Sequence, residues 1–250
     1  MVALVIDEGN SLTKISIMSQ KDNIDRTWRV KYLNVDVIVE FLANTVIDSA
    51  IYCSVKDKNL EVVEFLNQKN LFFIDFDISV PIPIEINYTT PYTLGTDRVA
   101  AAIGAGEIFH GENLLVVDLG SAITIDFIEN GSCFKGGNIT AGARLRYKSL
   151  SDFTDKLPRY VLPERDDFDI CSSSTREAIE NGVALGIVCE LEGYISRYRE
   201  LYPDLKIIFT GGDAKYFADK FKIAIFANCE LVNIGLYKVL KYNNVKTENK

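Results

Sequence analysis

Two acidic turn segments are the residues of this chain best suited to chemistry. Residues 7–11 (DEGNS) follow the apolar run 2–6, and residues 118–122 (DLGSA) follow the apolar run 114–117. Each segment places a carboxylate, a glycine and a hydroxyl residue at the end of an expected buried strand. Glycine permits a tight turn and a close approach of the backbone to a ligand. Two such turns facing each other would clamp a nucleoside triphosphate between two domains.

The first turn supplies candidate groups for phosphates. Backbone N–H groups of Gly9, Asn10 and Ser11 can hold phosphate oxygens, and the Asp7 carboxylate can hold a metal ion or its waters. Lys14 would add positive charge, or would simply be solvated on the far side of the hairpin. A plain β-turn is the alternative for this segment by itself, and the second copy of the pattern favours the phosphate site.

Residues 210–213 (TGGD) follow an apolar strand and precede an expected helix. The pair Gly211 and Gly212 would let a flat ligand such as adenosine lie against the backbone. The alternative is a loop that enters the helix, with the Asp213 side chain as its N-cap.

A third acidic segment, residues 95–98 (GTDR), is expected at a helix N-terminus. The helix dipole favours Asp97 there and holds its carboxylate ionised, which is a sufficient structural reason for an acidic residue. An ionised carboxylate is also what phosphoryl transfer to an alcohol needs in order to accept the proton of the hydroxyl. Arg98 would suit a substrate that bears a carboxylate.

Composition narrows the class of protein. The chain has 250 residues, 48% hydrophobic content and a formal net charge of −8. The acidic balance argues against nucleic acid as a partner, because phosphate neutralisation needs a basic patch. The five scattered cysteines do not form a disulfide framework. No apolar stretch approaches the ~20 residues that span a bilayer, and no signal peptide is recognisable. We therefore expect a cytoplasmic protein without a membrane partner.

The pattern of elements indicates an α/β protein with two domains, residues 1–112 and 113–250. Each half would be a β-β-β-α-β-α unit, with the active site in the cleft between the two units. Apolar spacing and turn signals predict the elements. Strands are expected at 2–7, 13–18, 27–33, 51–54, 72–75, 114–118, 123–129, 133–139 and 206–209, and helices at 36–48, 59–68, 99–109, 143–155, 175–201 and 233–241. Residues 81–91 and 158–170 are expected to be loops, and 243–250 a frayed tail. Asn130-Gly131 is a turn signal, and Ser174 with Glu177 fits a capping box at the start of the long helix.

Six segments carry a resemblance to a known family. DEGNS, TPYTLGTDRVAAAIGA, LLVVDLGSAITID, GGNITAGARLRYKSL, STREAIENGVALG and FTGGDA occur in the order found in type III pantothenate kinases. The resemblance covers nearly the whole chain, from Val2 to about Asn243. It implies two ribonuclease-H-like domains of the superfamily of acetate and sugar kinases, heat-shock chaperones and actin. It also implies ATP-dependent phosphorylation of pantothenate to 4′-phosphopantothenate, the first step toward coenzyme A.

The resemblance also implies roles for particular residues. Asp97 would be the general base, and Asp118 would bind a monovalent cation, potassium or ammonium, while magnesium would accompany ATP. Thr175 would contact pantothenate across the interface of a homodimer. The ATP phosphates would be held by Asp7, Glu8, Gly9, Asn10, Ser11, Leu12, Thr13, Lys14 and Ser121. The pantothenate site would be lined by Tyr88, Gly95, Thr96, Asp97 and Arg98. Ser121 replaces the usual threonine, and Ala141-Gly142 replaces the usual Pro-Gly; neither change removes a functional group.

Three alternatives stay open. A kinase for another small alcohol or acid would share the superfamily motifs, although the GTDR and STRE segments disfavour it. A regulator is a second alternative, because close relatives of the family are described as accessory factors in gene expression; the intact Asp97 and the acidic balance weigh against it. An actin-like or chaperone-like ATPase would need inserted subdomains for which 250 residues leave no room.

Overall fold

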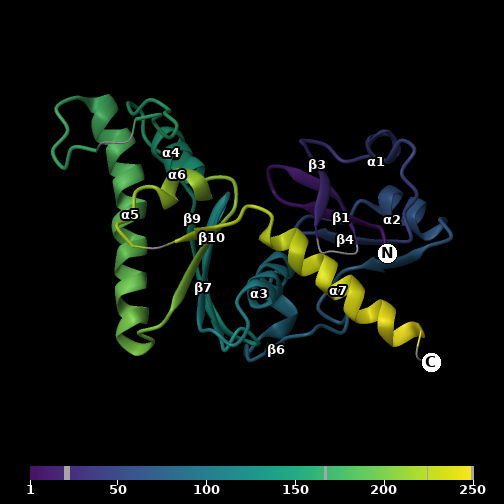
Figure 1. Ribbon diagram of the computed structural model, residues 1–250. Coiled ribbons are helices and arrows are strands. Elements are labelled where there is room, and N and C mark those ends of the chain that lie inside the picture. Colours follow the sequence, from purple (N-terminus) through teal and green to yellow (C-terminus); the bar gives the residue numbers. More distant parts are fainter. Residues whose placement is uncertain (20–22, 166–167, 224, 249–250) are drawn as a thin grey trace. The chain divides into compact units, whose positions relative to one another are not determined.

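The computed structural model describes residues 1–19, 23–165, 168–223 and 225–248, and the chain is an α/β protein with two mixed sheets (Figure 1). The first half contains β1 (Ala3–Glu8), β2 (Thr13–Met18), β3 (Ile24–Val30), α1 (Val35–Leu42), β4 (Ser49–Ser54), α2 (Leu60–Asn67), β5 (Phe72–Asp75), β6 (Glu85–Ile86), a 3-10 turn (Pro91–Thr93) and α3 (Thr96–Ile108). The second half contains β7 (Leu114–Leu119), β8 (Ala122–Glu129), β9 (Cys133–Ala141), α4 (Ala143–Asp152), α5 (Thr175–Leu201), β10 (Lys206–Thr210), α6 (Ala214–Ala218), β11 (Phe226–Ala227) and α7 (Leu231–Glu248).

The order of the strands repeats between the halves. The first sheet runs β3-β2-β1-β4-β5, and the second runs β11-β10-β7-β8-β9-β6. Read from β9 to β11, the second sheet has the same order as the first, with β7 in the place of β1. In both, the strand that carries the acidic turn pairs in parallel with the strand that follows the intervening helix. The duplication predicted from the sequence is confirmed.

Most predicted elements form, with shifted ends. The third strand lies at 24–30, and the helix predicted at 36–48 ends at Leu42, followed by Ala43 at φ 44°. The short elements α6 and β11 were not predicted. Asn130 and Gly131 both have positive φ, as their predicted turn requires. Part of the predicted loop 158–170, residues 166–167, lies outside the described residues.

The predicted frayed tail is wrong over most of its length, because α7 continues to Glu248. Asn243 Nδ2 donates to the carbonyl oxygen of Pro81 (2.8 Å) and to that of Val239 (2.9 Å). Asn244 Nδ2 donates to Met1 Sδ at 3.4 Å. These contacts hold a polar sequence in helical form. Residues 249–250 lie outside the described part.

Residues group into two compact units. The first consists of residues 1–111, 128–136 and 230–250, and the second of residues 112–127 and 137–229. The division predicted from the repeat, 1–112 and 113–250, describes the duplicated halves and stays a prediction. The compact units differ from it because the hairpin segment 128–136 and the C-terminal helix lie with the first unit.

The first unit has its core on both sides of its sheet. Leu4, Ile6 and Ile15 pack with Phe41 and Tyr52 on the side of α1 and α2. On the other side, α3 and α7 lie next to each other (Figure 1). They approach so closely that a side chain at Gly235 would overlap the carbonyl oxygen of Ala100. Helix α7 packs on β1 and β4, and α3 packs on β4, so the two helices cover this face of the sheet.

The second unit is built on the long helix α5 (Figure 1). Its core joins Leu115 and Val117 of β7 to Val183, Ile187 and Leu191 of α5. Burial on the sheet side fixes the register of β7, and so fixes where its acidic turn begins. Within the described residues, no helix has both the length and the apolar run required to cross a membrane.

Candidate active site

The first acidic turn forms the hairpin between β1 and β2. Asp7 lies opposite Lys14 of β2 and beside Cys53 of β4, and residues paired across strands point to the same face. The N–H of Gly9 donates to the carbonyl oxygen of Leu12 at 3.1 Å, which closes the turn. Lys14 therefore lies on the same face of the hairpin as Asp7 and not on the far side, and its contact with phosphates stays a prediction.

A carboxylate that the sequence analysis missed joins this group. Glu230, just before α7, forms an ion pair with Arg29, and its Oε2 lies 4.0 Å from Lys14 Nζ. Asn233 Nδ2 donates to Glu230 Oε2 at 3.1 Å. Glu230 is separated from Lys14 by more than 200 positions, so no local pattern could have associated them.

The Asp7 carboxyl group is strongly perturbed. Burial raises its pKa from 3.8 to about 6, and the negative charges of Asp97 and Glu230 add to the rise while Lys14 opposes it. The charge of Asp97, at the start of α3, thus acts on the carboxyl group of Asp7 in β1. The first unit thus brings together two of the predicted functional carboxylates.

Asp97 is the second residue of α3. Its Oδ1 accepts a hydrogen bond from the backbone N–H of Arg98 at 2.8 Å. Burial raises the pKa of the Asp97 carboxyl, and this outweighs the lowering by the Arg98 N–H and by the Arg98 charge. Desolvation therefore opposes the helix terminus that the sequence analysis considered, because burial disfavours the charged form.

The start of α3 also carries the other predicted substrate residues. Gly95 is the N-cap, and Thr96 Oγ1 accepts a hydrogen bond from Cys53 Sγ at 3.2 Å. This bond ties the first turn of α3 to β4, next to the strand that carries Asp7.

Arg98 is buried, with 7% of its surface exposed. Its guanidinium carbon lies 5.9 Å from the centre of the Tyr88 ring and 5.6 Å from that of Phe134. The two rings meet edge to face at 6.0 Å. Tyr88 and Arg98 therefore come together as predicted. Phe134 was missed, because a phenylalanine within a strand gives no functional signal.

The second acidic turn follows β7. Asp118 lies opposite Thr210 in the parallel pairing of β7 with β10, so the DLGSA and TGGD segments leave the same edge of the sheet. Gly211 has φ +91°, and a Cβ there would lie 2.6 Å from the carbonyl oxygen of Leu119. Only glycine fits both that conformation and that approach.

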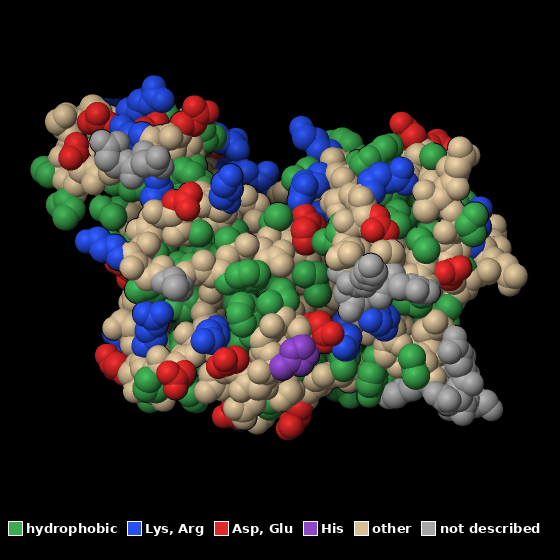
Figure 2. Space-filling view, viewed as in Figure 1, with side chains coloured by type: hydrophobic (Ala, Val, Ile, Leu, Met, Phe, Trp, Pro, Cys, Tyr) green, Lys and Arg blue, Asp and Glu red, His purple; other side chains and the backbone are tan. Residues whose placement is uncertain are grey.

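Arg144, a residue that the sequence analysis did not select, reaches this turn from α4. Its Nη2 donates to Ser121 Oγ at 3.5 Å, and the N–H of Gly142 donates to the carbonyl oxygen of Ser121 at 3.1 Å. Basic side chains are visible over the end of this unit that carries α4 and α6 (Figure 2). The signal was present in the sequence, since Arg144 lies in the GGNITAGARLRYKSL segment.

Asp213 occupies the N-cap position of α6 but makes no side-chain cap bond. The alternative reading of this aspartate as a helix cap is therefore wrong. Burial raises the pKa of the Asp213 carboxyl, and the charge of Arg144 opposes the rise. Its backbone N–H donates to the carbonyl oxygen of Leu119 at 3.0 Å.

Thr175 is the exposed first residue of α5. Ser174 caps the helix, since its Oγ accepts the N–H of Glu177 at 3.3 Å, as predicted. The Glu177 carboxylate accepts a hydrogen bond from the Ser173 hydroxyl at 3.5 Å. The helix start is thus fixed by its serines, and Thr175 is presented to solvent.

Two observations bear on bound cations. Within the described residues, no group of three or more acidic, histidine or cysteine side chains could hold a metal ion. The Thr210 hydroxyl, opposite Asp118, is buried and has no hydrogen-bond partner in the described part of the chain. An orphaned buried oxygen beside a carboxylate fits a hard cation, which prefers oxygen ligands.

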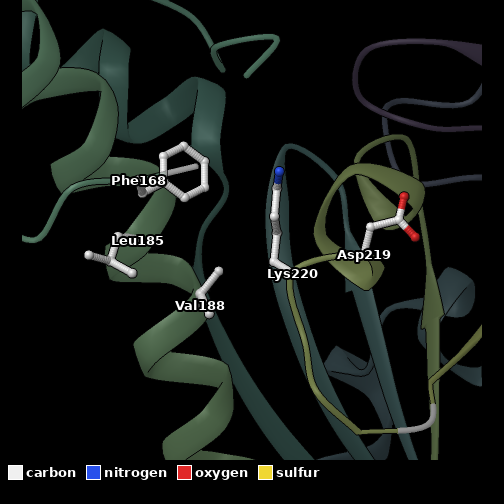
Figure 3. Close-up of a pocket in the computed structure, with 5 residues that line it drawn as sticks. All are labelled: Phe168, Leu185, Val188, Asp219 and Lys220. Carbon is white, nitrogen blue, oxygen red and sulfur yellow. The ribbon is translucent and has the colours of Figure 1, made fainter. Parts of the chain in front are cut away.

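A cavity of about 400 Å³ lies elsewhere in the second unit. Figure 3 shows Phe168, Leu185 and Val188 on one side and Lys220 opposite them, with the Asp219 carboxylate turned away. None of the predicted site residues lines it.

Comparisons with known proteins identify relatives of this chain. The family model described as "Type III pantothenate kinase" matches residues 3–197. Type III pantothenate kinases of Azobacteroides pseudotrichonymphae (36% identical over 239 residues, 96% of each chain) and Cytophaga hutchinsonii (36% over 241 residues, 96% of this chain and 99% of the relative) are similar along nearly their whole length.

Solved structures share the fold. A Campylobacter jejuni protein assigned to the Baf family of transcriptional activators has a TM-score of 0.65 and 29% identity, over 97% of this chain and 99% of that one. The Clostridium difficile activator of 2-hydroxyisocaproyl-CoA dehydratase, with bound ADPNP, has a TM-score of 0.56 and 14% identity over 100% and 98%. The latter similarity concerns the fold alone. Because the family model covers most of the chain and the relatives match it from end to end, this protein belongs to the type III pantothenate kinase family.

Proposed function

We propose that this protein transfers the γ-phosphoryl group of ATP to pantothenate, giving 4′-phosphopantothenate for coenzyme A synthesis in the cytoplasm. The observation that carries the proposal is the start of α3, where a half-buried Asp97 stands beside a buried Arg98 held against Tyr88 and Phe134. An alcohol that also bears a carboxylate needs this combination of a base and a cation.

The substrate contacts follow from these groups. Arg98 would bind the pantothenate carboxylate, because a guanidinium donates two parallel hydrogen bonds to a carboxylate. Tyr88, Gly95 and Thr96 would line the rest of the site. Burial of Arg98 strengthens the contact, since charge interactions grow when water is excluded.

ATP would be held by the residues of both turns. Residues 7–14 would bind the phosphates through backbone N–H groups and Lys14, and the Ser121 hydroxyl would contribute a further hydrogen bond. Gly211 and Gly212 would lie against the adenosine.

In the proposed reaction, the pantothenate hydroxyl oxygen attacks the γ-phosphorus of ATP. The new O–P bond forms as the bond from the γ-phosphorus to the bridging oxygen breaks, and ADP leaves. Asp97 orients the hydroxyl and accepts its proton. A carboxyl with a raised pKa is a stronger base than an ordinary aspartate, which supports this role.

Two cations would assist. Asp118, with the orphaned Thr210 hydroxyl opposite it, would hold a monovalent cation, potassium or ammonium. Asp7 would hold a water of the magnesium ion that accompanies ATP, which suits Mg²⁺ because it retains several waters in phosphate sites. When bound, these ions supply positive charge next to the transferring phosphoryl group.

We also propose a homodimer with the active site near the subunit interface. In it, Thr175 of the partner subunit contacts pantothenate. Mixing Asp97→Asn protein with Thr175→Ala protein tests this, because a shared site restores activity in mixed dimers and separate sites do not.

The test of function is ADP release from ATP, with and without pantothenate, and with and without potassium. Turnover that requires pantothenate and rises with potassium is the expected result. Absence of turnover with pantothenate, in a preparation that binds ATP, would reject the proposed substrate.

A regulatory role is the second candidate, favoured by the similarity to the Campylobacter jejuni protein assigned to a family of transcriptional activators. It predicts DNA binding in a mobility-shift assay at physiological salt. The net charge of −8 opposes such binding, so we expect no shift.

A further inference from the structure

The carboxylate of Asp213 makes no hydrogen bond within the described part of the second unit. Its backbone is fixed, since its N–H donates to Leu119 at 3.0 Å and its carbonyl oxygen accepts the N–H of Phe217 at 3.1 Å. Its side chain does not cap α6 and accepts no hydrogen bond within the described part of the chain. A half-buried carboxylate that loses solvation and gains no hydrogen bond in return is typical of a residue whose partner is a ligand.

Space for a ligand adjoins this carboxylate. Gly211 must be glycine because of its φ of +91° and its approach to Leu119. Gly212 has no such reason: a Cβ there would meet no atom within 4 Å, and its φ lies outside the left-handed region. The packing of the unit does not require a glycine at this position, so the bare backbone beside Asp213 is open to a molecule from outside.

Arg144 connects Asp213 to the turn that follows β7. The guanidinium donates to Ser121 Oγ at 3.5 Å and acts electrostatically on Asp213. If Ser121 binds a phosphate of ATP, then Asp213 lies one arginine side chain away from that phosphate. In a nucleotide, the group next to the phosphate chain is the ribose.

The charge of the Asp213 carboxylate determines which group of the nucleotide it can contact. An ionised aspartate is an acceptor only and repels phosphate, so it must face a donor. The ribose hydroxyls are the donors nearest to the phosphates. The positive charge of Arg144 disfavours the other use of such a carboxylate, a divalent cation.

We propose that Asp213 accepts a hydrogen bond from a ribose hydroxyl of the bound nucleotide, and so selects ribonucleotides over deoxyribonucleotides. This inference rests on the proposed function, since it takes ATP as the nucleotide and Ser121 as a phosphate contact. It adds a residue that determines specificity for the sugar of the nucleotide, a role that the proposed function assigns to no other residue.

The experiment compares kcat/KM for ATP, 2′-deoxy-ATP and 3′-deoxy-ATP at saturating pantothenate, in the full-length wild type and in Asp213→Ala. The wild type should prefer ATP by about tenfold or more over at least one deoxynucleotide, as expected for a hydrogen bond to a charged group. In Asp213→Ala this preference should fall below about twofold, because the variant loses activity with ATP and not with that deoxynucleotide. Asp213→Asn, which keeps an acceptor without the charge, should lie between the two.

Asp219→Ala is the matched control, because it removes the same charge from the exposed far end of α6. It should leave the preference unchanged. An equal loss with ATP and with both deoxynucleotides in Asp213→Ala would mean that Asp213 only shapes the loop, and would overturn the inference. A wild type that does not discriminate would overturn it as well.

Calorimetric titration with each nucleotide, without pantothenate, separates this inference from the proposed function. If pantothenate is not phosphorylated, but the wild type binds ATP more tightly than a deoxynucleotide and Asp213→Ala does not, then the substrate assignment fails and the ribose contact stands.

Discussion

Asp7 and Asp118 are equivalent residues of the two repeats, 118 − 7 = 111 positions apart, yet their surroundings differ. Asp7 lies among charged side chains, with Lys14, Asp97 and Glu230 all acting on it. Asp118 lies under a glycine turn, with the hydroxyl of Thr210 opposite and the backbone of Gly211 over it. The repeated strand and turn therefore position a carboxylate in each unit but do not determine which side chains surround it. The neighbouring helices differ as well, because Asp97 of α3 acts on Asp7 itself, whereas Arg144 of α4 donates a hydrogen bond to Ser121 of the turn that follows Asp118.

The largest expected effect tests the chemical role of the first unit. Asp97→Asn keeps the size of the side chain and the acceptor for the Arg98 N–H, but cannot take a proton. We expect kcat to fall by about 10²–10⁴-fold while the circular dichroism spectrum and the urea midpoint stay near those of the wild type. Near-normal turnover would remove Asp97 from the mechanism.

The second unit depends on backbone more than on charge, so its sensitive residue is a glycine. Gly211→Ala places a Cβ 2.6 Å from the Leu119 carbonyl oxygen at φ +91°. We expect the free energy of unfolding to fall by about 2–4 kcal/mol, measured by urea denaturation. Gly212→Ala is the control and should change stability by less than about 0.5 kcal/mol; equal losses in the two variants would contradict this account of the turn.

The charge environment of Asp7 predicts a dependence of stability on pH. The pKa is 3.8 in an ordinary aspartate and about 6 in the folded protein, so the folded state binds the proton more tightly. The contribution of Asp7 to the free energy of unfolding is therefore fully present below pH 4, where the carboxyl is protonated in both states. This contribution is lost as the pH rises through 6 and the carboxyl ionises in the folded protein. Asp7→Asn should therefore gain about 1–3 kcal/mol over the wild type at pH 8.

That gain should shrink progressively between pH 6 and pH 4, as the wild-type carboxyl becomes protonated. Urea denaturation of both proteins at pH 4 and pH 8 measures it. A difference in stability that does not vary with pH would mean that the surroundings of Asp7 do not disfavour its charge. Asp118→Asn provides the comparison with the second unit.

The smallest expected effect concerns the start of α5. Ser174→Ala removes the side chain that accepts the Glu177 N–H and should cost about 1 kcal/mol. Asn59→Ala in the first unit should cost more, because Asn59 caps α2 through Val62 and also donates to Leu33 at 3.0 Å. Thermal unfolding of the two variants tests the order; a larger loss in Ser174→Ala would contradict it.

Features of the site that depend on residues close together in the chain could be predicted from the sequence. The acidic turns, the cap at Ser174 and the double glycine after β10 are read from spacing, because their geometry involves neighbours along the chain. The start of α3 was predicted in the same way, and with it Asp97 and Arg98.

The remaining residues of the site are joined only by the fold. Glu230 reaches Lys14, and Phe134 reaches Arg98, through pairings of elements distant in sequence. The raised pKa of Asp97 also depends on burial, which a helix-dipole argument cannot supply. The end of α7 was misjudged because its contacts with Pro81 and Met1 are invisible in a polar sequence.

The place of α7 has a consequence for the order of folding. The first unit is built from the beginning of the chain, a hairpin in the middle and the last 21 residues, 230–250. Leu231, Leu236, Tyr237 and Leu240 of that last segment are buried. During synthesis, therefore, residues 1–111 leave the ribosome before the helix that completes their core has been made. All segments of the second unit, which ends at residue 229, are made before that helix. The domain that begins the chain is the last to be finished, and removal of the C-terminal helix would unfold the N-terminal half.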